Sequence, residues 1–260
     1  MPRLLTYNVH RCVGTDRRLD VARVAAVIAE QEPDIVCLQE LDVGRARTGH
    51  VDQAEAIARD LAMTFHFNAA MRIEAEEYGD AILTLRPERL IKSGALPTIR
   101  GVPGLEPRGA LWAAIDFDGV TLNVINTHLG LVPREQRLQA VALVGAGWAG
   151  HPECKGPTIL TGDFNATSMT RPYKTLARHL ADAQRLLGLK PSVKTFPSTF
   201  PTIRIDHAFV TPDIVPTRIW APRSPLARAA SDHLPLVMDF EIRPTAAADA
   251  GANGSAAATA

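Results

Sequence analysis

Residues 157–166, PTILTGDFNA, run through a mainly apolar stretch and then present a glycine, a carboxylate and an amide. A short apolar run of this kind predicts a buried strand. Because an ionised carboxylate is rarely buried without a partner or a metal, Asp163 and Asn165 indicate a polar site at the end of that strand. The alternative is an ordinary turn, for which Gly162-Asp163 is a common signal.

The same feature recurs in five other parts of the chain, where an apolar run meets polar side chains at one end. These pairs are Asn8 and His10, Gln39 and Glu40, Asn126 and His128, Asp206 and His207, and Asp232 and His233. Each pair taken alone has an ordinary structural explanation, such as an end-of-strand amide, a solvated turn residue or a rim histidine. Independent accidents on so many strands are improbable, so we expect these strand ends to converge on one site.

The residue types at these strand ends favour one kind of chemistry. Glu40, Asp163 and Asp232 offer hard oxygen ligands, which suit Mg²⁺, with Mn²⁺ as a substitute. Zinc is not favoured, because the chain has no H-E-x-x-H motif and no cysteine–histidine cluster. A divalent cation surrounded by acids, amides and histidines is suited to the attack of water on a phosphate ester.

Length and composition set limits on the fold and on the partners. The chain has 260 residues, 46% hydrophobic and 22% charged, which predicts one large domain over residues 1–243. Residues 244–260 are rich in alanine and glycine and predict a disordered tail. Lysine and arginine number 28 against 28 acidic residues, so no overall positive field indicates nucleic acid.

Cysteine usage and hydropathy bear on location. The three cysteines lie far apart in sequence and are expected to be reduced thiols. No apolar run reaches the length of a membrane span, so we expect a cytoplasmic protein. We also expect a monomer, although no sequence feature tests the oligomeric state.

Helices and short strands alternate along the chain. Helices are predicted at residues 19–31, beginning at Asp20, at residues 52–62, and through Leu138, Val141 and Ala142. Asp118-Gly119 predicts a hairpin between strands at residues 109–117 and 120–129. This order favours two packed sheets with helices outside. The glycine-rich motifs of nucleotide-binding folds are missing.

The motifs, in their order, resemble the endonuclease/exonuclease/phosphatase superfamily, which includes pancreatic deoxyribonuclease. The matching segments are LLTYNVH, PDIVCLQELD, YGDAILTL, EPRGAL, INTHLG, LTGDFNA, RIDHAF and SDHLPL, from about Leu4 to Leu236. The most specific combination is GDFN with an early QE and a C-terminal SDH. The resemblance implies an α/β fold, a four-layered sandwich of two central, mostly antiparallel sheets flanked by helices.

The resemblance also implies roles for the site residues. Glu40 would be the principal Mg²⁺ ligand, with Asn8 and Asp232 in or near its coordination sphere. Asp163 and Asn165 would orient the attacking water. His233, oriented by Asp206, and His128 would face the scissile phosphate, and the choice of Asp163 or His233 as the base stays open.

Other residues carry weaker expectations. Arg108 in EPRGAL would contact a substrate phosphate, and Arg45 and Arg47 would line the substrate mouth. The alternative for both loops is solvated polar surface. Asp80 stands where relatives often have asparagine and would add a negative charge near the cleft.

We therefore expect a Mg²⁺-dependent hydrolase of phosphodiesters, either a nuclease or an enzyme with a small diester substrate. A phosphomonoesterase and a phospholipid or inositol-phosphate hydrolase of the same family are alternatives. A non-catalytic phosphate-binding module is the alternative from another class. Low aromatic content, 5%, does not favour long nucleic acid, although it stays open as a partner.

Overall fold

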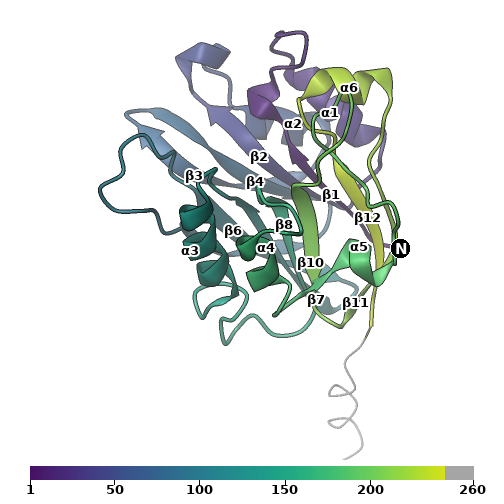
Figure 1. The fold of residues 1–260 in the computed structure, drawn as a ribbon. Helices are drawn as coiled ribbons and strands as arrows, with labels where there is room; N and C mark the ends of the chain where they lie inside the picture. Colours follow the sequence, from purple (N-terminus) through teal and green to yellow (C-terminus); the bar gives the residue numbers. More distant parts are fainter. Residues whose placement is uncertain (244–260) are drawn as a thin grey trace, which may run out of the picture.

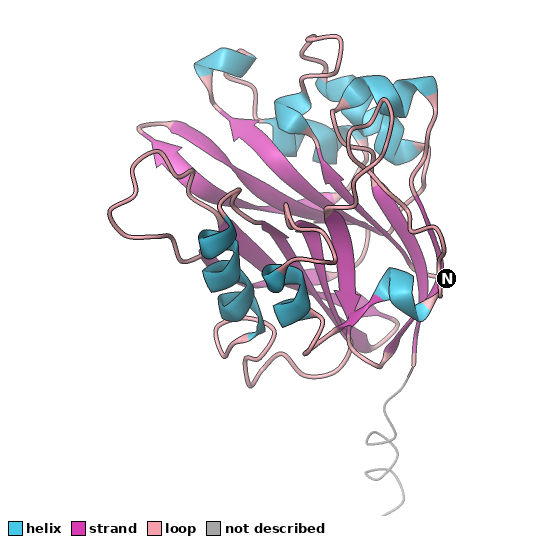
Figure 2. Cartoon of the chain, viewed as in Figure 1, coloured by secondary structure: helices cyan, strands magenta, loops and turns pink. Residues whose placement is uncertain are grey.

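The computed structural model describes residues 1–243 as four layers, helices–sheet–sheet–helices (Figure 1, Figure 2). The strands are β1 (Arg3–Asn8), β2 (Ile35–Val43), β3 (Thr64–Ile73), β4 (Glu76–Thr84), β5 (Glu88–Ala95), β6 (Gly109–Phe117), β7 (Val120–His128), β8 (Thr158–Asp163), β9 (Ala181–Asp182), β10 (Asp206–Val210), β11 (Ile214–Trp220) and β12 (Leu236–Ile242). The α-helices are α1 (Val21–Ala29), α2 (Gln53–Asp60), α3 (Pro133–Val144), α4 (Arg171–Leu176), α5 (Ala183–Leu186) and α6 (Pro225–Ala230). The predicted fold class is confirmed.

Each sheet has six strands and is mostly antiparallel. The first has the order β11-β12-β1-β2-β4-β3 and the second the order β5-β6-β7-β8-β10-β9. One parallel pair lies at the centre of each sheet, β1 with β2 and β7 with β8. Since strands of a parallel pair end at the same edge, the carboxyl ends of these four strands bring their terminal residues into two compact groups.

Apolar side chains fill the spaces between the layers. Leu4, Leu111 and Phe240 belong to the cluster between the two sheets. Strand residues that point the other way pack under α1, α2 and α6 on the first sheet and under α3 and α4 on the second. Figure 1 shows these two groups of helices on opposite sides of the paired sheets.

Local sequence signals explain several element boundaries. The Asp20 side chain accepts a hydrogen bond from Arg23 N and caps α1, as predicted, and Asp52 caps α2 in the same way. Asp118 and Gly119 both have positive φ, 56° and 89°, which makes the tight turn of the predicted β6–β7 hairpin. Cys12, Cys37 and Cys154 are free thiols.

The predicted alanine/glycine-rich tail, residues 244–260, lies outside the described residues, so the domain assignment stays a prediction. Across residues 1–243 no helix is both long and apolar enough to cross a bilayer.

Candidate active site

The predicted strand ends meet at a cleft of about 520 Å³. Its walls include predicted site residues from both sheets: Glu40, Arg47, Arg108, His128, Asp163, Asn165, Asp232 and His233. Asn8 and Asp206 lie behind this lining and contact it through hydrogen bonds. Most of the predicted strand-end residues therefore converge, whereas Gln39 and Asn126 lie between the sheets and His207 lies outside the cleft.

A β-bulge in β2 places Glu40 in the cleft. The pairing of β2 with β4 shifts register between Leu38 and Leu41, and Glu40 has a left-handed φ of 62°. Gln39 points between the sheets, where its amide donates to Asn126 Oδ1 at 2.8 Å. Because a bulge inserts one extra residue, Glu40 can face the cleft while Leu41 returns to the core beneath the helices.

The Asn8 side chain joins the two sheets at the base of the cleft. Its Nδ2 donates to Glu40 Oε1 at 2.9 Å and to Asp163 Oδ2 at 3.0 Å, and its Oδ1 accepts from His10 N at 3.0 Å. Because its Oδ1 accepts a backbone hydrogen bond, the Asn8 side chain is fixed and its Nδ2 positions the carboxylates of Glu40 and Asp163. Its predicted place as a metal ligand stays a prediction.

Glycine precedes Asp163 because the backbones of β7 and β8 approach closely. A Cβ on Gly162 would lie 1.9 Å from Thr127 O, and its φ is +139°. Asp163 follows as the last residue of β8, with Oδ1 accepting from Asn165 N at 2.8 Å. This bond fixes the carboxylate and leaves Oδ2 facing Asn8 and the cleft.

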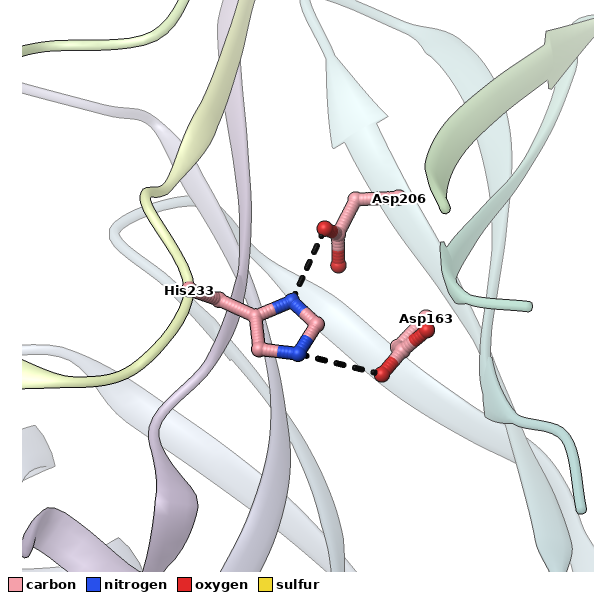
Figure 3. Close-up of side chains that lie close together, drawn as sticks. All are labelled: Asp163, Asp206 and His233. Carbon is pink, nitrogen blue, oxygen red and sulfur yellow. Dashed lines mark hydrogen bonds and ion pairs between the residues drawn. The ribbon is translucent and has the colours of Figure 1, made fainter. Parts of the chain in front are cut away.

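His233 lies between two carboxylates, as Figure 3 shows. Its Nδ1 is 2.9 Å from Asp206 Oδ2, and its Nε2 is 3.7 Å from Asp163 Oδ2. Asp206 is held in turn by the hydroxyl of Thr195, a buried residue that sequence reasoning did not single out. The predicted orientation of His233 by Asp206 is present in the geometry.

Burial and charge oppose each other at this pair. Burial lowers the pKa of His233, but Asp206 and Asp163 outweigh it and raise the pKa to about 10. Burial raises the pKa of Asp163 to about 7, although the charge of His233 acts in the opposite direction. At neutral pH His233 is therefore a proton donor beside a carboxyl group that exchanges its proton readily.

His128 is held as a neutral imidazole. Arg108 Nη1 donates to its Nδ1 at 3.0 Å, and since arginine cannot accept, the ring proton belongs on Nε2. Burial and the charge of Arg108 lower its pKa well below the usual value. Nε2 lies 3.6 Å from Asp163 Oδ2, so this N–H faces the cleft. Asn165 Nδ2, 3.0 Å from the same Nε2, donates to Leu129 O and cannot accept the ring proton.

Two further carboxylates in the cleft suit a divalent cation. Glu40 and Asp232 face the cleft with side chains 20% and 42% exposed. Within residues 1–243 neither carboxylate pairs with a lysine or arginine, and the ring nitrogens of His128 and His10 lie 4.0 Å from Glu40 and 3.9 Å from Asp232. Two unneutralised carboxylates in one cleft fit Mg²⁺.

Asp163, Asp206 and His233 also lie close enough to be considered a metal site, with ligand atoms within 4.8 Å. Protonation of the imidazole argues against that use, because His233 Nδ1 donates to Asp206 and the protonated ring has no free lone pair. We therefore treat these three residues as a hydrogen-bonded acid–base group.

Two of the three predicted substrate arginines line the cleft. Arg47 forms two hydrogen bonds to the buried Asp42, at 2.7 and 2.6 Å, and Arg108 pairs with Glu106 at 2.5 Å. Arg45 does not line the cleft, since it is held by Glu76 at 3.3 Å. A substrate role for any of them stays a prediction.

The structure adds cleft residues that sequence reasoning left without a role. His10 and Arg11 enter the cleft from a turn after β1 in which His10, Arg11 and Cys12 all have positive φ, 46–56°. His10 was visible as a polar strand end, but no sequence signal marks three successive left-handed residues. Tyr78 completes this wall, with Arg47 over its ring at 5.4 Å.

Asp80 does not simply add charge near the cleft. It is buried, and burial raises its pKa to about 8, against the attraction of Arg108. At neutral pH the carboxyl is therefore largely protonated, which makes it similar in charge to an asparagine. His207, one of the strand-end residues, does not line the cleft and lies among Phe164, Tyr173 and Phe209.

Comparison with known proteins agrees with this geometry. The model of the Endonuclease/Exonuclease/phosphatase family matches residues 5–233. The protein named uncharacterized protein YbhP from Escherichia coli K12 is 27% identical over 258 residues, covering 92% of this chain and 96% of its own. An endonuclease/exonuclease/phosphatase from Bacteroides vulgatus superposes with a TM-score of 0.74 at 21% identity, covering 93% of this chain and 99% of its own.

The fold is also that of the mannosyl-6-phosphatase Bt3783 of Bacteroides thetaiotaomicron, with a TM-score of 0.73 at 19% identity over 93% of this chain and 100% of that one. At this identity the two solved structures establish the fold only. The family match is broader evidence, because it spans most of the chain and contains nearly all of the motif residues between Leu4 and Leu236. The chain therefore belongs to the endonuclease/exonuclease/phosphatase family, whose members are hydrolases of phosphate esters that generally depend on a divalent metal.

Proposed function

We propose that the protein is a Mg²⁺-dependent phosphoesterase that cleaves a phosphodiester bond in a compact substrate by in-line attack of water. The observation that carries this proposal is the convergence of Asp163 and His233 on one cleft, with Asp206 bonded behind the imidazole. A proton acceptor and a proton donor thus face the same space, beside two unneutralised carboxylates.

Glu40 and Asp232 would hold the cation, with Asn8 keeping Glu40 in place. When bound, Mg²⁺, or Mn²⁺ in its place, supplies positive charge that polarises a phosphoryl oxygen. Replacing Glu40 by glutamine keeps the shape and removes the charge, so it tests the ligand assignment directly.

The chain's own residues would carry the protons. Asp163 Oδ2 accepts the proton of the attacking water, and the backbone bond from Asn165 keeps that oxygen directed at the cleft. His233 donates from Nε2 to the phosphoryl group, because Asp206 holds its Nδ1–H. The neutral His128 offers a second N–H to the same group.

The dimensions of the cleft favour a compact substrate. A volume of about 520 Å³ falls within the range of small-molecule sites. Arg11, Arg47 and Arg108 line it and would attract an anionic ligand. A nucleic acid would then enter only by its end or as a single nucleotide unit.

A phosphomonoester is the second candidate, and the arginines favour it because a terminal phosphate carries more charge than a diester. The Bacteroides thetaiotaomicron protein that shares the fold is, by its name, a phosphatase. The same cleft would then bind a sugar or other metabolite phosphate.

Hydrolysis of bis-p-nitrophenyl phosphate and p-nitrophenyl phosphate with Mg²⁺, with Mn²⁺ and with EDTA tests the proposal. We expect metal-dependent turnover of the diester, lost in Glu40→Gln and reduced about a hundredfold or more in His233→Ala. Asp118→Asn, whose wild-type side chain is 90% exposed, is the control, and its turnover should equal that of the wild type.

Turnover of the monoester alone would make the protein a phosphatase. No turnover of either ester, or of DNA, RNA and inositol phosphates, would favour a non-catalytic binding module.

A further inference from the structure

The outer face of α3 and α4 differs in charge from the balanced chain as a whole. Residues 129–150 and 164–180 contain five lysines and arginines, Arg134, Arg137, Arg171, Lys174 and Arg178. The acidic residue in these segments, Glu135, is buried, whereas all five cationic residues are exposed. Within residues 1–243 none of the five pairs with a carboxylate. We call this face, with the loops that precede the two helices, the α3–α4 surface.

The same surface exposes large aliphatic side chains. Leu138 and Val141 of α3 are 43% and 58% exposed, and Leu131 and Met169 in the preceding loops are 73% and 82% exposed. The inward face of α3 is partly polar, because its glutamines are buried beside Ala140 and Leu143. Gln136 donates to Gly130 O and Asn165 O, and Gln139 accepts from Gly130 N.

The two helices enclose a groove of about 360 Å³ with walls made mainly of carbon atoms. Pro133 and Pro172 line it, together with the side chains of Arg134, Arg137 and Arg171. Figure 1 shows α3 and α4 side by side on the outside of the second sheet. Leu131, two residues before Pro133, lines the catalytic cleft, so groove and cleft adjoin.

Exposed aliphatic side chains beside unpaired arginines are complementary to an anionic lipid surface. Aliphatic groups enter the boundary between headgroups and acyl chains, and arginine binds lipid phosphates through paired N–H donors. A nucleic-acid surface would offer stacking aromatics, whereas the large exposed apolar side chains on the α3–α4 surface are all aliphatic. We propose that the α3–α4 surface docks the protein on an anionic lipid bilayer beside the mouth of its cleft.

Sedimentation with vesicles tests this docking without any catalytic readout. Vesicles of phosphatidylcholine, with and without phosphatidylglycerol, are incubated with the full chain and with two triple variants. One variant is Leu138→Ser, Val141→Ser and Met169→Ser, and the other is Arg134→Gln, Arg137→Gln and Arg171→Gln. All six positions are exposed, so the fold should be kept. The matched controls are Ile73→Ser, Leu85→Ser and Leu90→Ser, and Arg59→Gln, Arg72→Gln and Arg89→Gln.

We expect the full chain to sediment with the anionic vesicles, and less so as salt is raised. Each triple variant should lower the partition coefficient at least about tenfold, and the controls should leave it unchanged. Hydrolysis of the chromogenic esters should be the same in all of them. Glu40→Gln should sediment like the full chain, so that failure of the proposed chemistry and failure of docking are distinguishable.

Three results would overturn the proposal. The first is no sedimentation of the full chain with anionic vesicles at low salt. The second is unchanged sedimentation of both triple variants. The third is tighter binding of the full chain to DNA than to vesicles, with the aliphatic variant binding DNA normally, which would make this surface a nucleic-acid site.

Discussion

His233 shows how one residue obtains its chemistry from its neighbours. Burial alone would make the ring neutral, yet the carboxylates of Asp206 and Asp163 hold the proton on it. The two carboxylates are not equivalent, because Asp206 is bonded to Nδ1 at 2.9 Å and Asp163 lies 3.7 Å from Nε2. Asp206 is thus a positioning residue, and Asp163 is free to exchange a proton with water.

Replacing Asp206 by asparagine should therefore change the pH dependence as well as the rate. In the wild type, activity should rise as Asp163 loses its proton near pH 7 and fall only as His233 loses its proton near pH 10. Asp206→Asn removes one of the charges that raise the pKa of His233, so the alkaline limb should move to lower pH and the rate should fall about tenfold or more. A pH profile of kcat/KM measures both. An alkaline limb that stays in place would contradict the assignment.

At Asp80 the same physics acts on stability. Its pKa in the folded protein is raised to about 8, above the value of an unfolded chain, so the stability it contributes is present below about pH 4 and is lost as pH rises toward 8. Asp80→Asn should stabilise the fold by on the order of 5 kcal/mol at pH 8 and by little near pH 4. Urea unfolding at both pH values measures this, with the exposed Asp118→Asn as control. Equal effects at both pH values would refute it.

At the scale of elements, the β7–β8 pair depends on Gly162. An alanine there would place its Cβ 1.9 Å from Thr127 O at a φ of +139°. We expect Gly162→Ala to destabilise the protein by at least about 3 kcal/mol. Gly94→Ala in β5, where a Cβ would meet nothing within 4 Å, should change stability by less than about 1 kcal/mol. Urea unfolding compares the two, and similar losses would contradict the steric argument.

Features set by neighbouring residues could be predicted from the sequence. Features that depend on residues distant in the sequence could not. Asp20 and Asp118-Gly119 act on their own neighbours, so sequence alone located a helix start and a hairpin. The bulge at Glu40 depends on pairing with β4, and the inward glutamines of α3 depend on Gly130 and Asn165. Apolar periodicity traces α3 but does not reveal that Leu138 and Val141 are exposed while Leu143 is buried.

At the scale of the whole molecule, the site exists because two sheets meet. Asn8 is the last residue of β1 and Glu40 lies in the bulge of β2, both in the first sheet. His128, Asp163 and Asp206 belong to strands of the second sheet. The motifs identified these residues because each is a polar side chain in an apolar context. Thr195, His10 and Arg11 were not assigned roles, since their contacts depend on loop paths that no local pattern specifies.

Joining the sheets brings carboxylates together, and this predicts a link between metal and stability. Glu40 Oε1 and Asp163 Oδ2 both accept from Asn8 Nδ2, at 2.9 and 3.0 Å, so their charges lie close together. Without metal, Glu40→Gln should be more stable than the wild type because it removes one of these charges. With Mg²⁺ at ten times its Kd, the wild type should gain about 1.4 kcal/mol, or roughly 3 °C in Tm.

Thermal unfolding with MgCl₂, against NaCl at equal ionic strength, measures this gain independently of any substrate. The gain should vanish in Glu40→Gln and persist in His233→Ala, since His233 Nδ1 is bonded to Asp206 and not to the proposed cation ligands. If Mg²⁺ raised the Tm of Glu40→Gln as much as that of the wild type, the cation would bind elsewhere.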